Sequence, residues 1–154
     1  MVRMATSASQ VTLQLKPRSR LDLIDVNQQL STQFGNWIEP YNHALYYSYH
    51  TTAGYLDQRF CQRFGNDSEN LQSFVRSFQC IFPPGADYHH DQIELRQELT
   101  EEEKKGEPKN ADAHLTFISS GLTNCATYRN KPRIPVYFID LDGVNGTLRR
   151  LRQT

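Results

Sequence analysis

The segment from Leu71 to Phe82 constrains the fold of this chain most strongly. Its apolar residues follow the i, i+3, i+4, i+7 spacing of one helix face, at Leu71, Phe74, Val75, Phe78, Ile81 and Phe82. Asp67 or Ser68 can cap the start, and Pro83-Pro84-Gly85 stops the helix because proline cannot continue one. The pattern therefore predicts an amphipathic helix that packs one face on a core and extends to residue 82.

The rest of the chain alternates between strand and helix signals. Strands are expected at 11–15, 21–24, 44–50, 122–128, 136–141 and 147–151, and further helices at 26–34, 56–64 and 112–120. Turn residues at 17–20 and 129–132 suggest two hairpins. The chain has 154 residues and no internal repeat. We expect one α+β domain, with a mostly antiparallel sheet and helices packed on one face.

The expected domain covers residues 11–154, after a polar and disordered N-terminus at 1–10. Residues 92–109 form a charged surface insert. Within it, Thr100 and Glu103 have the spacing of a capping box, which favours a short solvated helix. A mobile surface loop is the competing interpretation.

The charge balance and the cysteines narrow the class of protein. Lysine plus arginine equals aspartate plus glutamate, 17 against 17, so no overall field favours nucleic acid or an anionic membrane. No apolar run is long enough to span a bilayer. The cysteines Cys61, Cys80 and Cys125 are odd in number and form no CxxC pair, which is typical of reduced thiols in a cytoplasmic protein. Cys80 is expected in the core.

Three histidines lie beside small or acidic residues near the ends of predicted elements: His50, His90 and His114. Brought together, three imidazoles could bind a divalent metal or transfer protons near neutral pH. His89 and His90 are neighbours and point apart, so only one of them should enter a shared site. The alternative is structural: a strand-end His50 that bonds a turn and a His114 packed on the sheet. No HExxH or zinc-finger spacing occurs.

Other segments have the chemistry of ligand contacts. Thr51 and Thr52 precede two small residues, Ala53 and Gly54, which would let backbone approach a ligand closely. The basic residues Arg149, Arg150 and Arg152 could bind phosphate, although a solvated strand edge is the more common explanation for such residues.

Taken in order, these segments resemble the YjbQ-type family, whose members are named secondary thiamine-phosphate synthases. The resemblance rests on 49–54 (YHTTAG), 88–91 (YHHD), 110–115 (NADAHL) before 119–122 (SSGL), and 136–143 (VYFIDLDG) before Arg149-Arg150. It spans nearly the whole chain. The sequence departs from the family pattern at 55–59, where an Asn-Glu pair is usual, and at Arg133-Ile134, where a Trp-Gln pair is usual. Asp140 stands for a glutamate, and the insert is longer.

The resemblance implies a homotrimer with a site built from His50, His90 and His114, as metal ligands or acid/base groups. It also implies a divalent metal, zinc before magnesium, and the joining of a pyrimidine pyrophosphate to a thiazole phosphate. We therefore expect an enzyme, a transferase or hydrolase, acting on a small phosphorylated metabolite. Asp91 would orient a histidine. The candidate substrate contacts are Thr51, Thr52, Asn110, Ser119, Ser120 and Arg149.

Two other functions are compatible with the same residues. The missing Trp-Gln and Asn-Glu pairs favour a non-catalytic homotrimer that binds a metabolite or a protein partner. A relic kept only for assembly is the third hypothesis, and the presence of all three histidine segments speaks against it.

Overall fold

The computed structural model describes residues 9–154 of the chain. Most of the expected disordered N-terminus, residues 1–8, lies outside the described residues; Ser9 and Gln10 are exposed. The α-helices are α1 Val26–Phe34, α2 Gln58–Arg63, α3 Ser68–Gln79, α4 Glu101–Gly106 and α5 Ala111–Ser119. The strands are β1 Gln14–Leu15, β2 Asp22–Asp25, β3 His43–Tyr47, β4 Ala53–Gly54, β5 Cys125–Arg129, β6 Tyr137–Asp140, β7 Val144–Asn145, β8 Leu148–Arg149 and β9 Arg152–Gln153.

Strand β6 is the centre of the fold. It pairs antiparallel with β2 on one side and with β4 on the other. Successive side chains of a strand point to opposite faces, so Ile139 and Phe138 enter different apolar clusters. Both side chains are fully buried, which makes β6 the partition between the two halves of the core.

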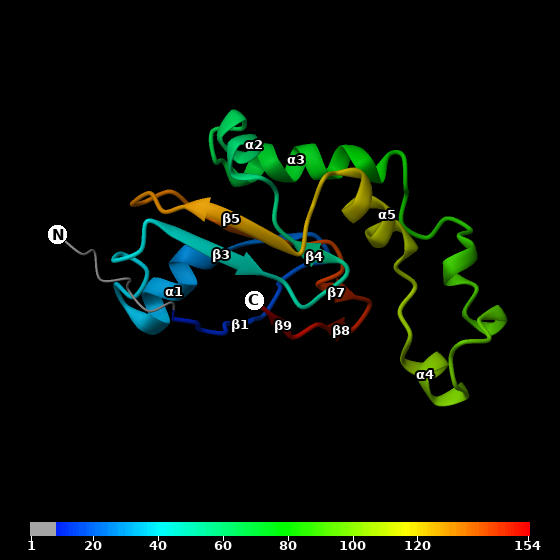
Figure 1. The fold of residues 1–154 in the computed structure, drawn as a ribbon. Coiled ribbons are helices and arrows are strands. Elements are labelled where there is room, and N and C mark those ends of the chain that lie inside the picture. The colour runs from blue at the N-terminus through cyan, green and yellow to red at the C-terminus, as the bar shows by residue number, and fades with distance from the viewer. Residues whose placement is uncertain (1–8) are drawn as a thin grey trace.

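The first cluster lies between β6 and the helices α2, α3 and α5, which Figure 1 shows on one side of the molecule. From α3, Leu71 and Val75 are fully buried, as the helical spacing predicts. Helix α3 is shorter than predicted, because it ends at Gln79 and not at residue 82, and only turns follow before the prolines. As a result Ile81 is exposed, and Cys80, expected in the core, is exposed too.

The second cluster lies on the opposite face of β6 and contains α1. Val26 and Leu30 of α1 pack there, so this helix is the exception to the expectation that helices cover one face only. The aromatic rings of this second cluster contact one another. The ring of Tyr46 meets that of Tyr55 at a tilt and that of Tyr128 edge to face. Burying these hydroxyls requires partners, and that of Tyr46 donates to Asn27 Oδ1 at 2.9 Å.

The two predicted hairpins do not form. β1 pairs with β9 near the C-terminus, and β2 pairs with β6. Likewise β5 pairs with β3 over five residue pairs, from His43–Arg129 to Tyr47–Cys125, and not with β6. The strand expected at 147–151 is the short β8, which forms a hairpin with β7, and β9 lies just beyond the expected range. The strand pairs of residues 9–154 are antiparallel, as predicted, and apart from the β7–β8 hairpin they join distant parts of the chain.

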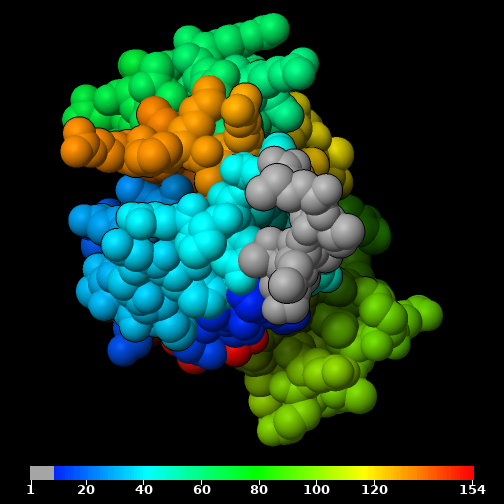
Figure 2. Space-filling model, turned by 60° about the vertical axis from the view of Figure 1, so that its left-hand side comes forward, coloured from blue at the N-terminus to red at the C-terminus, as the bar shows by residue number. Residues whose placement is uncertain are grey.

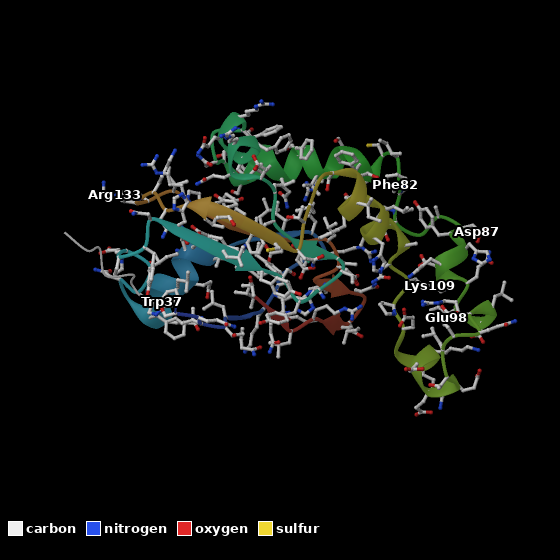
Figure 3. All side chains as sticks on the ribbon, in the orientation of Figure 1. Trp37, Phe82, Asp87, Glu98, Lys109 and Arg133 are labelled. Atoms are coloured by element: carbon white, nitrogen blue, oxygen red, sulfur yellow. The ribbon has the colours of Figure 1, made fainter. Side chains whose placement is uncertain are left out.

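Residues 87–109 form an arm that extends away from the body of the molecule, with Asp87 and Glu98 on the arm and Lys109 at its return (Figures 2 and 3). The capping box at Thr100 is confirmed, with both reciprocal hydrogen bonds to Glu103, and α4 forms there. Arg96 bridges Glu98 and Glu107 across the arm at 2.6 and 2.8 Å. Among the described residues, no helix is long and apolar enough to cross a bilayer.

Candidate functional site

A polar cavity of about 290 Å³ opens where four segments meet: the loop after β3, the start of α5, the return of the arm, and the C-terminal strand region. The lining residues are Tyr49, His50, Thr51, Thr52, Glu107, Pro108, Asn110, His114, Arg150 and Arg152. The cavity therefore brings together His50, His114, Thr51, Thr52 and Asn110, which are five of the residues expected in the site.

A buried ion-pair network forms the floor of this cavity. Asp140 and Asp142 are both fully buried. The guanidinium of Arg152 donates two hydrogen bonds to the carboxylate of Asp140, at 2.7 and 2.8 Å. Burial raises the pKa of Asp140, and Arg152 opposes that shift. Asp140 occupies the position where the family pattern has a glutamate, and here its carboxylate holds an arginine in place.

Thr52 belongs to this network more than to the cavity. Its hydroxyl accepts a hydrogen bond from Arg152 at 3.1 Å, and its carbonyl accepts one from the backbone of Leu141 at 3.0 Å. The small residues that follow it serve packing and not ligand approach. A Cβ on Gly54 would collide with the carbonyl oxygen of Thr123, because β4 lies against that backbone. Thr51 is exposed at the rim.

His50 has a fixed tautomer. Its Nε2 accepts a hydrogen bond from the backbone N–H of Gln153 at 2.8 Å. Burial lowers the pKa of His50, and the nearby Arg152 and Arg150 lower it further. The ring is thus neutral with its hydrogen on Nδ1, so His50 can offer a donor but has no second lone pair.

His114 projects from the first turns of α5 into the same cavity. Burial lowers the pKa of His114, and the neighbouring His90 lowers it further. The two rings lie 5.0 Å apart between centroids, at an angle of 54°. His90 lies beside His114 but does not line the cavity, and its side chain is 36% exposed.

Asp91 connects His90 to the start of α5. One of its oxygens, Oδ1, lies 3.0 Å from His90 Nδ1 and accepts the backbone N–H groups of Asn110 and Ala111 at 3.1 and 3.0 Å. Asn110 makes no side-chain cap of its own, so Asp91 caps α5 from a distant segment. The adjacent His89 is exposed. Of the two neighbouring histidines, His90 is therefore the one that contacts Asp91 and the ring of His114.

Three expected substrate contacts lie elsewhere. Ser119 and Ser120 are at the far end of α5, and Ser120 bonds the carbonyl of Phe117. Arg149 is exposed on β8 and does not line the cavity. Arg149 ends β8, whereas Arg150 lies in the link between β8 and β9 and Arg152 begins β9, and only Arg150 and Arg152 line the cavity. Because no single strand spans these three arginines, the sequence pattern did not distinguish them, and Arg150 and Arg152 were missed.

The residues do not form a metal centre as they stand. Within residues 9–154 there is no group of three His, Cys, Asp or Glu side chains with metal-binding geometry. The lone pair of His50 Nε2 is already used by Gln153, and His90 does not line the cavity. A three-histidine zinc site would require His50 to release that hydrogen bond.

His43 lines a second cavity, of about 590 Å³ and with mainly apolar walls. These walls come from α1, β3 and the segment before β1, and include Trp37 and Tyr47. His43 does not line the polar cavity that contains His50 and His114.

Solved structures share this fold. A hypothetical protein of Aeropyrum pernix K1 matches with a TM-score of 0.58 and 16% identity, covering 93% of this chain and 92% of that one. An uncharacterized conserved protein of the YjbQ/UPF0047 family from Clostridium acetobutylicum matches with a TM-score of 0.56 and 17% identity, covering 94% and 95%. A YbjQ-like protein of unknown function from Sulfolobus solfataricus P2 matches with a TM-score of 0.58 and 13% identity, covering 93% and 91%.

No family model matches the sequence, and no curated protein matches it. Because the sequence identities are only 13–17%, these matches show that the fold is shared and nothing more. The chain is a single α+β domain with the YjbQ-type fold, which is the fold that the sequence resemblance predicts.

Proposed function

We propose that this protein is a cytoplasmic enzyme of the YjbQ family that binds a small phosphorylated metabolite in the polar cavity. One observation carries the proposal. Arg150 lines the cavity beside two neutral imidazoles, and its buried Nε has no hydrogen-bond partner within residues 9–154. A guanidinium has five N–H donors, and phosphate oxygens match their fork.

The ion-pair network prepares Arg150 for this role. Its Nη2 donates to Asp142 Oδ2 at 3.0 Å, which fixes the direction of the side chain. Its remaining donors are then available to a ligand. Arg152 is committed to Asp140, Thr52 and the Asp142 carbonyl, so it acts as support. In a reaction that releases pyrophosphate, Arg150 would stabilise the charge on the leaving oxygens.

His114 is the proposed acid/base group. It is neutral, lines the cavity, and contacts the ring of His90, which in turn contacts Asp91. A carboxylate that bonds one nitrogen of an imidazole fixes the tautomer of the ring. Asp91 would thereby leave Nε2 of His90 as the nitrogen available toward its neighbours. Removing such a group typically costs on the order of 10²-fold in rate.

Phosphate binding provides the first test. Arg150→Ala should weaken binding of inorganic phosphate, measured by isothermal titration calorimetry, by roughly tenfold or more. Arg149→Ala removes the same charge one residue away and should leave binding nearly unchanged. Equal effects of the two variants would show that only the general charge matters and would remove the proposed site.

The second test concerns turnover. His90→Ala and His114→Ala should abolish transfer or hydrolysis of phosphorylated pyrimidine and thiazole substrates, whereas His89→Ala should retain most of it. Thermal melts of all variants control for folding. If His89→Ala is the inactive variant, the assignment is wrong.

We also propose that a divalent metal, zinc in preference to magnesium, can bind in this cavity, although the phosphate site does not depend on it. His114 and His90 are the residues that would hold it, with His50 joining after it leaves Gln153. Bound zinc would polarise a phosphoryl oxygen. Metal analysis of the purified protein, followed by the same analysis on His114→Ala, tests this: equal zinc content in both would remove the metal from the proposal.

The second candidate function is a non-catalytic homotrimer that binds the metabolite or a partner. The outer face of β3 supports self-association. Leu45 is 64% exposed and Tyr47 49% exposed, although both lie in a regular strand. Light scattering should give a trimer, and Leu45→Asp should shift it toward monomer. A wild-type mass near 17.9 kDa would rule the trimer out. Trimers that bind phosphate without turnover would favour the non-catalytic function.

A further inference from the structure

Asn110 lines the polar cavity and is 5% exposed. Its Nδ2 donates to Asp142 Oδ2 at 2.9 Å. A carboxylate can only accept, so the amide nitrogen must face Asp142 and the orientation of the amide is settled by chemistry. The other amide atom, Oδ1, is buried and has no hydrogen-bond partner in the described part of the chain.

A buried acceptor without a donor is unfavourable, and such atoms are rare in folded proteins. No other residue of 9–154 supplies the donor, whereas a ligand in the cavity would. The same wall contains the unpaired Nε of Arg150. Two residues that line the cavity thus contain an unused acceptor atom and an unused donor atom, both of them buried.

Asp142 sets the distance between these two groups. Its Oδ2 accepts from Asn110 Nδ2 at 2.9 Å and from Arg150 Nη2 at 3.0 Å. Nδ2 and Nη2 can therefore be at most about 6 Å apart, and the unused Oδ1 and Nε, each about 2.3 Å from the bonded nitrogen of its side chain, at most about 11 Å. A phosphate ester a few bonds long, with a hydrogen bond of about 3 Å at each end, spans that range.

We propose that Asn110 selects ligands that carry a hydrogen-bond donor, a hydroxyl or amine, a short linker away from the phosphate. The phosphate faces Arg150 and the donor meets Asn110 Oδ1. This inference rests on the proposed phosphate site and narrows its ligand class: bare phosphate and alkyl phosphates bind, and phosphates with a nearby donor bind tighter.

Three probes of similar size isolate the donor: 2-hydroxyethyl phosphate, propyl phosphate, in which a methyl replaces the hydroxyl, and 2-methoxyethyl phosphate, which keeps the oxygen but has no donor. Calorimetric titration of the wild type should give roughly fivefold tighter binding for the hydroxyl probe than for either of the others. The methoxy probe separates a donor preference from a general preference for polarity.

Asn145 offers a matched control. Its Nδ2 also donates to Asp142, at Oδ1 and 3.0 Å, but the residue does not line the cavity. Asn145→Ala should keep the fivefold preference. Asn110→Ala should lose it while still binding propyl phosphate, with thermal melts confirming that both variants fold.

The possible failures are distinct. If the wild type binds all three probes equally, or if Asn110→Ala keeps the preference, Oδ1 does not recognise the ligand and a buried water satisfies it. If none of the probes nor inorganic phosphate binds, the phosphate site itself is wrong and this inference falls with it.

Discussion

Replacing Arg152 by methionine should destabilise the protein strongly, because the arginine compensates a fully buried carboxylate. Its guanidinium makes two hydrogen bonds to Asp140 and one each to the Thr52 hydroxyl and the Asp142 carbonyl. The arginine side chain is 6% exposed and that of Asp140 0%. Water therefore cannot take over when the guanidinium is removed.

Breaking a buried pair by removing one partner costs about 3–5 kcal/mol. Domains of this size unfold with about 5–15 kcal/mol, so the loss is a large part of the total. At about 2–4 °C per kcal/mol, the melting temperature should fall by roughly 6–20 °C. Urea unfolding followed by circular dichroism gives the free energy directly.

Two comparisons control this prediction. Arg149→Met changes an exposed arginine nearby and should stay within about 0.5 kcal/mol of wild type. The double variant Asp140→Leu with Arg152→Met leaves no unpaired charge and should be more stable than Arg152→Met alone. A loss below about 1 kcal/mol in the single variant, or no recovery in the double variant, would refute the reasoning.

Two further predictions concern pH and capping. Burial lowers the pKa of His50 and His114, so the unfolded chain binds more protons just below pH ~6.5, and stability should fall as the pH drops through that window. Thermal melts from pH 7.5 to 5 should show a smaller loss for the double variant His50→Gln with His114→Gln, and an unchanged slope would contradict the assignment. Asp91→Ala should cost about 1–2 kcal/mol in urea unfolding because α5 loses its cap, whereas the exposed Asp87→Ala should cost almost nothing; equal costs would show that the cap contributes little.

Local signals in the sequence predicted the local elements well. The apolar spacing identified α3, and Thr100 with Glu103 identified α4. Each depends on residues within one or two turns of each other. The end of α3 was misplaced because Ile81 and Phe82 continue the apolar spacing, and turn hydrogen bonds to the Phe78 carbonyl, beyond the last residue of the regular helix.

Strand partners were not predictable in the same way. Turn residues suggested hairpins, but β3 pairs with β5 from about 80 positions further along the chain, and β1 pairs with β9 at the C-terminus. The register of a strand pair is set by the face that each strand buries. Which face is buried depends on the neighbouring strands, and a local sequence pattern does not identify those neighbours. The capping of α5 by Asp91 was unpredictable for the same reason, because its carboxylate accepts backbone N–H groups that lie 19 and 20 positions further along the chain.

The structure places part of the expected set together, with His50 and His114 in one cavity and His90 in contact with His114. The resemblance covered Arg149 and Arg150 alike, and the sequence did not show that only Arg150 of this pair lines the cavity. The network of Asp140 and Asp142 that orients Arg150 and Arg152 had no clear sequence signal, since each acidic residue also suits a turn.

A crystal structure of the protein grown with 2-hydroxyethyl phosphate tests the central claim most directly. The account predicts a phosphoryl group in the polar cavity with its oxygens on Arg150, close to His114, and the hydroxyl directed to Asn110. A structure in which the ligand binds at the exposed Arg149, or in the apolar cavity beside Trp37, while the polar cavity stays free of it would contradict the account.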